Sequence, residues 1–380
     1  MISIEEKKQC SGCTACANIC SQNAISMVPD DMGFLYPLVI KSLCVNCGLC
    51  EKVCQFHPGY LRYDNFDTPI VFSGRLKKTD ELARSQSGGA FFAIADHLIK
   101  NGGVVYGAAF KETWCVTHQR AADKKQLETL RMTKYVQSDV RGVYSLVKDD
   151  LKKGLIVLFS GTACQVAGLK SYIPVKYHDN LFCIDIICHG VPSPKIWQDY
   201  IEYIEDRYKS RIIKACFRDK RFGWHGARES YLLEDGREVY MRTNNYLYFN
   251  GYTLRDSCSS CVFTNTMRVG DITVGDLWGL PKDSLYEKDA KGVSLILVNS
   301  EKGNKLYEKI KHTLYVKKVN VNHFLQPQLQ YPSEINPKRD FFLADYRNKG
   351  FEYVAHKYGN LGWRYRLKKL IYSIINIIRL

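Results

Sequence analysis

The chain has 380 residues, enough for two or three domains, and 46% of them are hydrophobic, as in ordinary globular proteins. Lys and Arg outnumber Asp and Glu by 54 to 39, and this net charge of +15 suits an anionic membrane surface or an acidic substrate. The excess is spread along the chain and no nucleic-acid-binding motif is present, so no nucleic-acid partner is expected.

Two runs of four cysteines stand near the N-terminus. Each has the spacing C-x₂-C-x₂-C-x₃-C of bacterial ferredoxins that hold two 4Fe-4S clusters. In such proteins three closely spaced cysteines bind one cluster and the fourth binds the other. The predicted ligands of the first cluster are Cys10, Cys13, Cys16 and Cys54, and those of the second are Cys44, Cys47, Cys50 and Cys20.

Zinc ligation and disulfide bonds are the alternatives for these runs. Zinc usually takes four ligands, commonly as two C-x₂-C pairs, and has no use for a duplicated run of four. Disulfides need an oxidising compartment, whereas the odd remainder of seven cysteines favours a reducing cytoplasm. In one departure, Ser21 and Gln55 replace the proline that normally follows the fourth cysteine, which predicts a looser exit turn.

A cytoplasmic location also fits the two ends of the chain. The N-terminus has no apolar segment of the kind found in signal peptides, and no apolar run approaches the roughly 20 residues that span a bilayer. Residues 361–380 combine a helical apolar face with Arg and Lys, within a basic tail at 350–380. This pattern predicts an amphipathic helix, either at the inner membrane surface or packed on protein.

In chain order, residues 1–60 are predicted to form a two-cluster ferredoxin domain closed by strands at 24–29 and 35–40. A turn-rich linker at 57–69 leads to a second domain at 70–330. Alternating strands and helices there indicate an α/β core with parallel strands, and a hairpin signal at 230–241 makes the sheet mixed. Strands are expected at 70–74, 104–110, 155–160, 181–187, 292–300 and 314–321, and helices at 90–99, from 164, at 193–209 and at 301–312, with Ser87 as a helix cap.

Three loops after buried strands or before helices are candidate ligand sites: Ser160–Gln165, Cys188–Gly190 and Ser85–Gly89. Clusters pass single electrons and rarely perform substrate chemistry alone, so a two-electron centre is expected here. Two of the loops precede helices, whose free N–H groups suit a phosphate or a reduced flavin, although a plain turn explains each loop taken singly. Without a G-x-G-x-x-G fingerprint, no Rossmann dinucleotide site is predicted.

Several motifs in one order give the chain a family resemblance. They are Ser87–Gly89, Lys134–Ser138, Gly161–Gln165, Cys188–Gly190, Cys258–Cys261, Gly270–Ile272 and Gly275–Gly279, together with the cysteine runs. Over roughly residues 1–330 the chain resembles the coenzyme F420 hydrogenase/dehydrogenase beta-subunit family. The resemblance implies FAD, iron–sulfur clusters and two-electron exchange with a substrate, for which the deazaflavin coenzyme F420 is the namesake. One departure is Ala163, where the family commonly has proline, so that loop is expected to be less rigid.

From this resemblance, FAD is expected to contact nine residues: Ser87, Gly88, Gly89, Lys134, Ser160, Gly161, Thr162, Cys164 and Gln165. Lys134 would be a cation near the flavin or its phosphates, and the alternative is a solvated surface lysine. His189 is the candidate catalytic proton donor, and the alternative is a structural histidine bonded to its own loop.

A third cluster held by Cys164, Cys188, Cys258 and Cys261 is one interpretation of the later cysteines, and small buried thiols are the other. Cys115, Cys183 and Cys216 are read as core thiols. A basic, aromatic loop contains Arg218, Lys220, Arg221, Trp224 and His225. It either holds the anionic group of a small substrate or is a solvated surface loop.

The leading hypothesis is a flavin- and iron–sulfur-dependent oxidoreductase that couples two 4Fe-4S clusters to hydride-type chemistry at FAD. Its partners would be a ferredoxin or an enzyme subunit and a small anionic substrate, with F420 as one candidate. The alternatives are a non-catalytic electron-relay subunit and a redox enzyme of cell-envelope polysaccharide biosynthesis, because some members of the family stand beside such functions.

Overall fold

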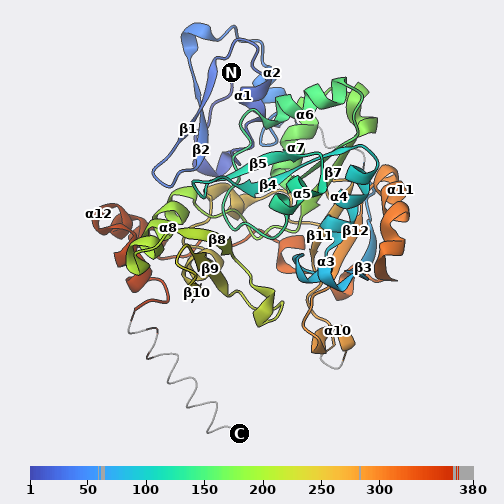
Figure 1. The fold of residues 1–380 in the computed structure, drawn as a ribbon. Helices are drawn as coiled ribbons and strands as arrows, with labels where there is room; N and C mark the ends of the chain where they lie inside the picture. The colour runs from blue at the N-terminus through green and yellow to red at the C-terminus, as the bar shows by residue number, and fades with distance from the viewer. Residues whose placement is uncertain (59, 61–64, 282–283, 363–364, 366, 368–380) are drawn as a thin grey trace.

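The N-terminal module protrudes from one end of the molecule in the computed structural model, which describes all residues except 59, 61–64, 282–283, 363–364, 366 and 368–380 (Figure 1). Strands β1 (Ile25–Pro29) and β2 (Leu35–Val39) pair antiparallel, as predicted. Two short helices, α1 (Ala15–Ile19) and α2 (Leu49–Lys52), each contain the third cysteine of a run. The local pattern therefore places each run in a loop that ends in a helical turn.

The centre of the molecule is an eight-stranded mixed sheet with the order β13-β3-β12-β11-β7-β6-β4-β5. Neighbours from β4 to β11 run parallel, and the pairs outside them are antiparallel. Its strands are β3 (Ile70–Leu76), β4 (Val104–Phe110), β5 (Val116–Ala121), β6 (Val157–Thr162), β7 (Leu181–Ile186), β11 (Ile272–Asp276), β12 (Ser294–Val298) and β13 (Leu314–Lys318). The prediction of a mixed sheet with parallel strands is confirmed.

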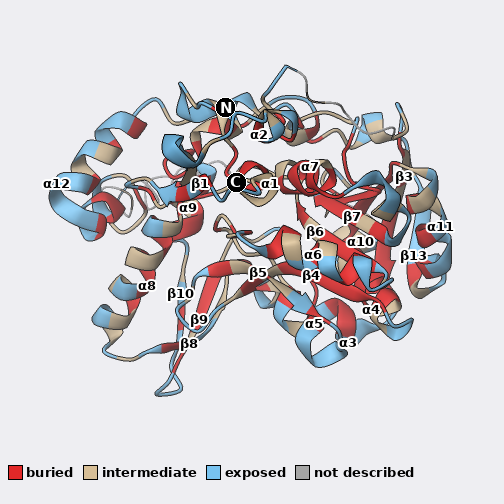
Figure 2. Cartoon of the chain, turned by 90° about the horizontal axis from the view of Figure 1, so that it is seen from above, coloured by how far each residue is buried: buried red, intermediate tan, exposed pale blue. Residues whose placement is uncertain are grey.

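Helices cover both faces of this sheet, because its strands alternate apolar side chains between two cores. Leu158 of β6 joins the core beneath α3 (Thr79–Ala83), α4 (Ala90–Lys100), α5 (Lys124–Leu130) and α11 (Glu301–Ile310). Its neighbour Phe159 points the other way, into the core beneath α6 (Val143–Lys152) and α7 (Ala163–Tyr172). Figure 2 shows the buried residues concentrated along these strands and on the inward faces of the helices.

A smaller lobe packs beside the large sheet around an aromatic core that includes Trp197 and Phe342. It consists of α8 (Pro194–Tyr208), the sheet β8 (Ile212–Cys216), β9 (Glu229–Leu233) and β10 (Glu238–Met241), α9 (Thr243–Phe249) and α12 (Arg339–Lys357). The predicted hairpin is β9–β10, while α9 and α12 were not predicted. The short α10 (Leu285–Lys288) lies in the connection between β11 and β12.

Two local expectations are wrong. Ser87 does not cap α4: the N-cap is Gly89, and the Ser87 hydroxyl donates to the Val293 carbonyl at 2.8 Å. Cys115 is exposed rather than a core thiol, because it lies in the tight turn between β4 and β5, whereas Cys183 is buried and Cys216 half-buried. Most of the predicted helix at 361–380 lies outside the described residues, and none of the described helices is long and apolar enough to cross a membrane.

The N-terminal module packs on the large domain through α1 and α7. Ala15 of α1 belongs to the same core as Val166 and Ala167 of α7. At the closest point, a β-carbon added to Gly168 would lie 3.0 Å from the Cys13 sulfur and 3.2 Å from the Tyr144 hydroxyl. Only a residue without a side chain leaves room for the cysteine loop against this helix.

We therefore expect Gly168→Val to weaken this contact. Overpacking a filled interface typically costs about 1–3 kcal/mol. Chemical denaturation of the full chain should show that loss. The matched control is Ser171→Ala, which removes only a hydroxyl bonded to the Ala167 carbonyl of its own helix. Equal stability of Gly168→Val and the native chain would contradict the packing described here.

Candidate functional site

The predicted ligands of the first cluster lie close together. Burial, together with the neighbouring Cys10 and Cys54, raises the pKa of the Cys13 thiol to about 12. Burial is also the main cause that raises the pKa of Cys16, and Cys13, Cys10 and Cys54 add to this effect. These mutual effects show that the four thiols lie near one another, where α1, the loop before it and the end of the second run meet.

The predicted ligands of the second cluster surround a cavity of about 30 Å³, whose lining contains Cys20, Cys44, Cys47 and Cys50. Cys47 is exposed, so this site lies at the molecular surface. In the described part of the chain no three His, Cys, Asp or Glu side chains lie close enough together to bind a metal ion. The cysteines instead surround cavities, and their donor chemistry fits thiolate ligation of a 4Fe-4S cluster.

The expected looser turn after Cys54 is tied down by a side chain. Gln55 is buried, and its amide donates to the Ser11 hydroxyl at 2.5 Å. The Ser11 carbonyl in turn accepts from Gln137 of the large domain at 2.8 Å. Polar contacts thus replace the missing proline and join the two ends of the first cluster site to the large domain.

Four later cysteines also meet. Cys164, Cys188, Cys258 and Cys261 line one cavity of about 40 Å³ between the N-terminal module and the large domain. Burial raises the pKa of Cys188, and Cys258 and Cys164 raise it further. The four residues come from the start of α7, the loop after β7, and the helical turn Asp256–Ser260 with the residue after it. The fold thus brings together the four cysteines that the sequence offers as ligands of a third cluster.

A larger cavity of about 510 Å³ lies at the carboxyl ends of β6, β7 and β11, the usual ligand edge of a parallel sheet. Seven of the nine predicted flavin contacts line it: Ser87, Gly89, Lys134, Ser160, Gly161, Thr162 and Gln165. Gly88 is not among its lining residues and packs on the sheet, since an added β-carbon would lie 2.1 Å from the Gly74 carbonyl oxygen. Cys164 lines the smaller four-cysteine cavity instead.

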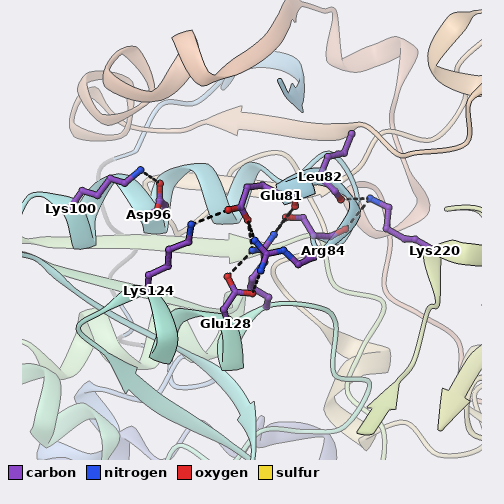
Figure 3. A network of polar contacts seen from close by, with 10 residues as sticks. Glu81, Leu82, Arg84, Asp96, Lys100, Lys124, Glu128 and Lys220 are labelled. Carbon is purple, nitrogen blue, oxygen red and sulfur yellow. Dashed lines mark hydrogen bonds and ion pairs between the residues drawn. The ribbon is translucent and has the colours of Figure 1, made fainter. Parts of the chain in front are cut away.

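A buried ionic network holds the loop at 85–89 against this cavity (Figure 3). Arg131 donates to the Glu81 carboxylate at 2.7 Å and to the Ser85 hydroxyl at 2.7 Å. Lys220 reaches across from the smaller lobe and donates to the carbonyls of Leu82, Ser85 and Ser87, each at 2.9 Å. Arg131 was not a candidate in the sequence, because its partners stand 46 to 50 residues away.

Within this fixed loop, Gln86 presents unpaired polar atoms. Both the nitrogen and the oxygen of its amide are buried without a hydrogen-bond partner, and the residue lines the large cavity. Burying an amide unpaired costs free energy, so such a group is expected to find a partner in a ligand. A flavin ring offers alternating N–H and C=O groups of matching kind. The loop therefore fits the implied cofactor.

Side-chain hydrogen bonds fix the second loop, in which Ala163 stands where the family commonly has proline. Thr162 and Gln165 form a capping box at the start of α7, with the Thr162 N–H donating to Gln165 at 3.0 Å. Beneath it, buried His118 contacts the Ser160 carbonyl through Nε2 at 2.9 Å and Ser138 through Nδ1 at 2.8 Å. Burial lowers the pKa of His118 to about 4, so it is neutral at pH 7. No motif marked His118 in the sequence.

Lys134 lines the cavity but is not a solvated surface lysine. Its amine donates to the carbonyls of Thr129 and Arg131 at 3.0 and 2.5 Å, at the carboxyl end of α5. Burial lowers the pKa of the amine to about 7. None of the ion pairs found among the described residues includes Lys134, so a charged form lacks a carboxylate counter-ion.

His189 lies where the two cavities meet, because it lines both. Its Nδ1 lies 3.0 Å from the amide nitrogen of Gln328 and 3.3 Å from the Ser333 hydroxyl, so its partners are not in its own loop. An amide N–H donated to Nδ1 leaves the proton of the neutral ring on Nε2. Burial lowers the pKa of His189, which favours this neutral form at pH 7.

The basic loop is not simply solvated. Arg218 is buried and pairs with Asp276 at 2.6 Å, and exposed Arg221 pairs with Asp219 and Glu238. Trp224 is buried and stacks on Trp278 with ring centroids 4.7 Å apart. His225 pairs with Glu287 at 2.7 Å. Only Arg218 and His225 of this loop line the large cavity, so most of its charge serves internal contacts.

Comparison with known proteins gives two family matches. Residues 155–323 match the C-terminal region of the family described as "Coenzyme F420 hydrogenase/dehydrogenase, beta subunit", and residues 9–57 match the 4Fe-4S dicluster domain. Residues 155–323 thus form a domain of the F420 hydrogenase/dehydrogenase beta-subunit type, and residues 9–57 form a 4Fe-4S dicluster domain. The two domains together support an iron–sulfur redox role.

Among solved structures, a chain of the F420-reducing [NiFe] hydrogenase complex from Methanosarcina barkeri is similar at 16% sequence identity and a TM-score of 0.48. The match covers 78% of this protein and 93% of that chain. A comparison with curated proteins finds no match.

The network at Glu81 yields a stability prediction. Burial alone would raise the pKa of Glu81, but hydrogen bonds from Arg131 and Lys124 lower it from the ordinary 4.5 to about 2. We expect Arg131→Met to cost about 3 kcal/mol, since it leaves a buried carboxylate short of its main partner. Denaturant titrations at pH 7 would measure the loss.

The matched control is Lys124→Met, at the exposed arm of the same network, with an expected cost below about 1 kcal/mol. A lowered carboxyl pKa stabilises the fold above pH 4.5, and this contribution is lost as the pH falls toward 2. Glu81→Gln should therefore flatten that part of the stability profile. Equal losses in the Arg131 and Lys124 variants would contradict the assignment.

Proposed function

We propose that this protein is a flavin- and iron–sulfur-dependent oxidoreductase, with FAD in the large cavity and clusters at the three cysteine sites. The observation that carries the proposal is the adjacency of the sites. Cys188, His189 and Gly190 line both the large cavity and the four-cysteine cavity. Ser11, between the ligands of the first cluster, also lines the four-cysteine cavity.

These shared walls support an order of electron transfer. The second cluster site lies at the surface, where a ferredoxin or a partner subunit has access through exposed Cys47. The first cluster site follows. Its Cys13 is close enough to Cys164 of the third site for Cys164 to raise the pKa of Cys13. The third site then borders the large cavity. In this proposal the domain at 1–60 is the relay, and the domain at 70–330 holds the reaction site.

The chain's own residues bind and orient the flavin and move a proton. FAD supplies the conversion between one-electron and two-electron transfer when bound. Gln86 and the N–H groups at the starts of α4 and α7 would bind its polar edge or its phosphates, and Lys134 would compensate negative charge. His189 would hold a proton on Nε2 for a substrate that is reduced there.

A small anionic two-electron carrier such as coenzyme F420 is the proposed substrate class. The family description names F420, and the cavity lining contains Arg218, His225 and Lys134. An electron-relay subunit and a polysaccharide-modifying enzyme are the competing functions. Substrate-dependent flavin oxidation by the isolated chain, measured with F420 and without a partner subunit, would exclude the pure relay.

Cofactor content tests the proposal directly. Anaerobically purified and reconstituted protein should contain about twelve iron atoms and one extractable FAD per chain, as expected for three 4Fe-4S clusters. A Cys258→Ser, Cys261→Ser variant should lose about four of these irons and keep the flavin. Cys115→Ser, at an exposed thiol outside all three sites, should change neither. Full iron content without flavin would contradict the proposal.

Lys134 makes flavin binding depend on pH. Below its pKa of about 7 the amine is a cation, so anion binding should be strongest there and weaken as the pH rises above about 7. Lys134→Met should reduce FAD affinity about tenfold at pH 6, which matches one charge-assisted hydrogen bond, and should flatten the pH profile. Fluorescence titration measures both.

The control is Lys125→Met, an exposed lysine on α5 outside the cavity lining. It should bind FAD like the native chain at every pH. A native profile in the Lys134 variant would show that this amine does not contact the cofactor.

A further inference from the structure

Arg255 is the most enclosed cation near the cluster sites. Its side chain is fully buried and extends from the large domain into the N-terminal module. The guanidinium donates to the carbonyl oxygens of Cys10 at 2.7 Å and Leu35 at 2.8 Å, and to the Gln137 side chain at 3.0 Å. It also lies 3.6 Å from the Cys10 sulfur and over the Tyr36 ring, 4.3 Å from its centroid.

The surrounding backbone is shaped to admit this group. Gly12 has a φ of +69°, and a β-carbon there would lie 2.8 Å from an Arg255 nitrogen. Because position 12 is a glycine, the backbone of the cysteine loop can lie directly against the guanidinium. The guanidinium has five N–H donors in one plane, and the close contact with the loop holds this charged group in one position.

No ion pair found among the described residues includes Arg255. Arg268 lines the same four-cysteine cavity but pairs with Asp185 at 3.0 Å, which neutralises it. A buried charge without a counter-ion is strongly unfavourable, so an anion is expected beside Arg255. The sulfurs provide one: the guanidinium contacts the Cys10 sulfur, and Arg255 lines the four-cysteine cavity beside Cys164 and Cys258.

We propose that Arg255 is a positioning residue for electron transfer, whose fixed charge raises the reduction potential of the cluster bound by Cys10 and of the cluster in the four-cysteine cavity. A cluster gains one negative charge on reduction, so a neighbouring buried cation favours its reduced state. The second cluster site is not in contact, because Arg255 is absent from its lining. This role rests on the proposed function, in which clusters occupy these sites.

The test is an EPR-monitored redox titration of the reconstituted full chain, with iron content measured on each sample. Arg255→Gln should lower the reduced-to-oxidised ratio of the affected clusters about tenfold at a given applied potential, equivalent to about 59 mV for one electron. The cluster at Cys44, Cys47, Cys50 and Cys20 should stay unchanged and serves as the internal reference. Arg255→Lys keeps the charge and should stay within about threefold of the native ratio.

A second pair of variants leaves the arginine in place. Gln137→Glu puts a carboxylate where the amide oxygen now accepts from Arg255, so it neutralises the charge with almost no change in shape. Gln137→Glu should lower the reduced-to-oxidised ratio of the same clusters, as Arg255→Gln does. Gln137→Met loses the hydrogen bonds to Arg255 and Ser11 but adds no charge, and should keep the native ratio within about threefold.

The outcomes separate this inference from the proposed function. Full iron content with native potentials in both Arg255→Gln and Gln137→Glu would overturn the role of the charge alone. Equal shifts in Arg255→Lys and Arg255→Gln would also overturn it, since they would reflect packing. A native chain that binds no iron–sulfur cluster after reconstitution would overturn the proposed function together with this role.

Discussion

The structure depends on one contact between distant parts of the chain. The first cysteine run packs against α7 and against the loops around Arg255. Electron transfer needs redox sites to be close, and the covalent connection between the two domains does not by itself fix that distance. Here it comes from packing of Ala15 on the α7 core and from the hydrogen bonds of Arg255 and Gln137 to Cys10, Leu35 and Ser11. The interface is therefore both a structural joint and the proposed path of the electrons.

Two kinds of buried cation lie around the proposed cofactor sites, and they differ in what neutralises them. Arg131, Arg218 and Arg268 each pair with a carboxylate and hold loops or strands in place. Lys134, Lys220 and Arg255 donate to backbone carbonyls instead, and no ion pair among the described residues includes them. The first group stabilises the cavity walls, whereas the second leaves positive charge near sites that favour anions.

Local sequence patterns were sufficient to predict the parts of the site that one segment forms. Cysteine spacing can be read along the chain, so the two ferredoxin-type sets could be proposed from it, and the thiols of each set lie near one another. Short apolar runs likewise predicted β4, β6 and β7 and the loops that follow β6 and β7. The Ser87 cap failed because that hydroxyl has a distant partner, the Val293 carbonyl, that no local pattern reveals.

The same reason explains what the sequence did not show. Arg131, His118 and Arg255 act on residues 20 to 245 positions away, so their roles follow from topology rather than from spacing. Arg255 is the clearest case. The adjacent Asp256 carboxylate pairs with Arg339, and the Arg255 side chain is buried instead of pairing with it. A sequence pattern gives the charge of a residue, but only the fold decides which group compensates it.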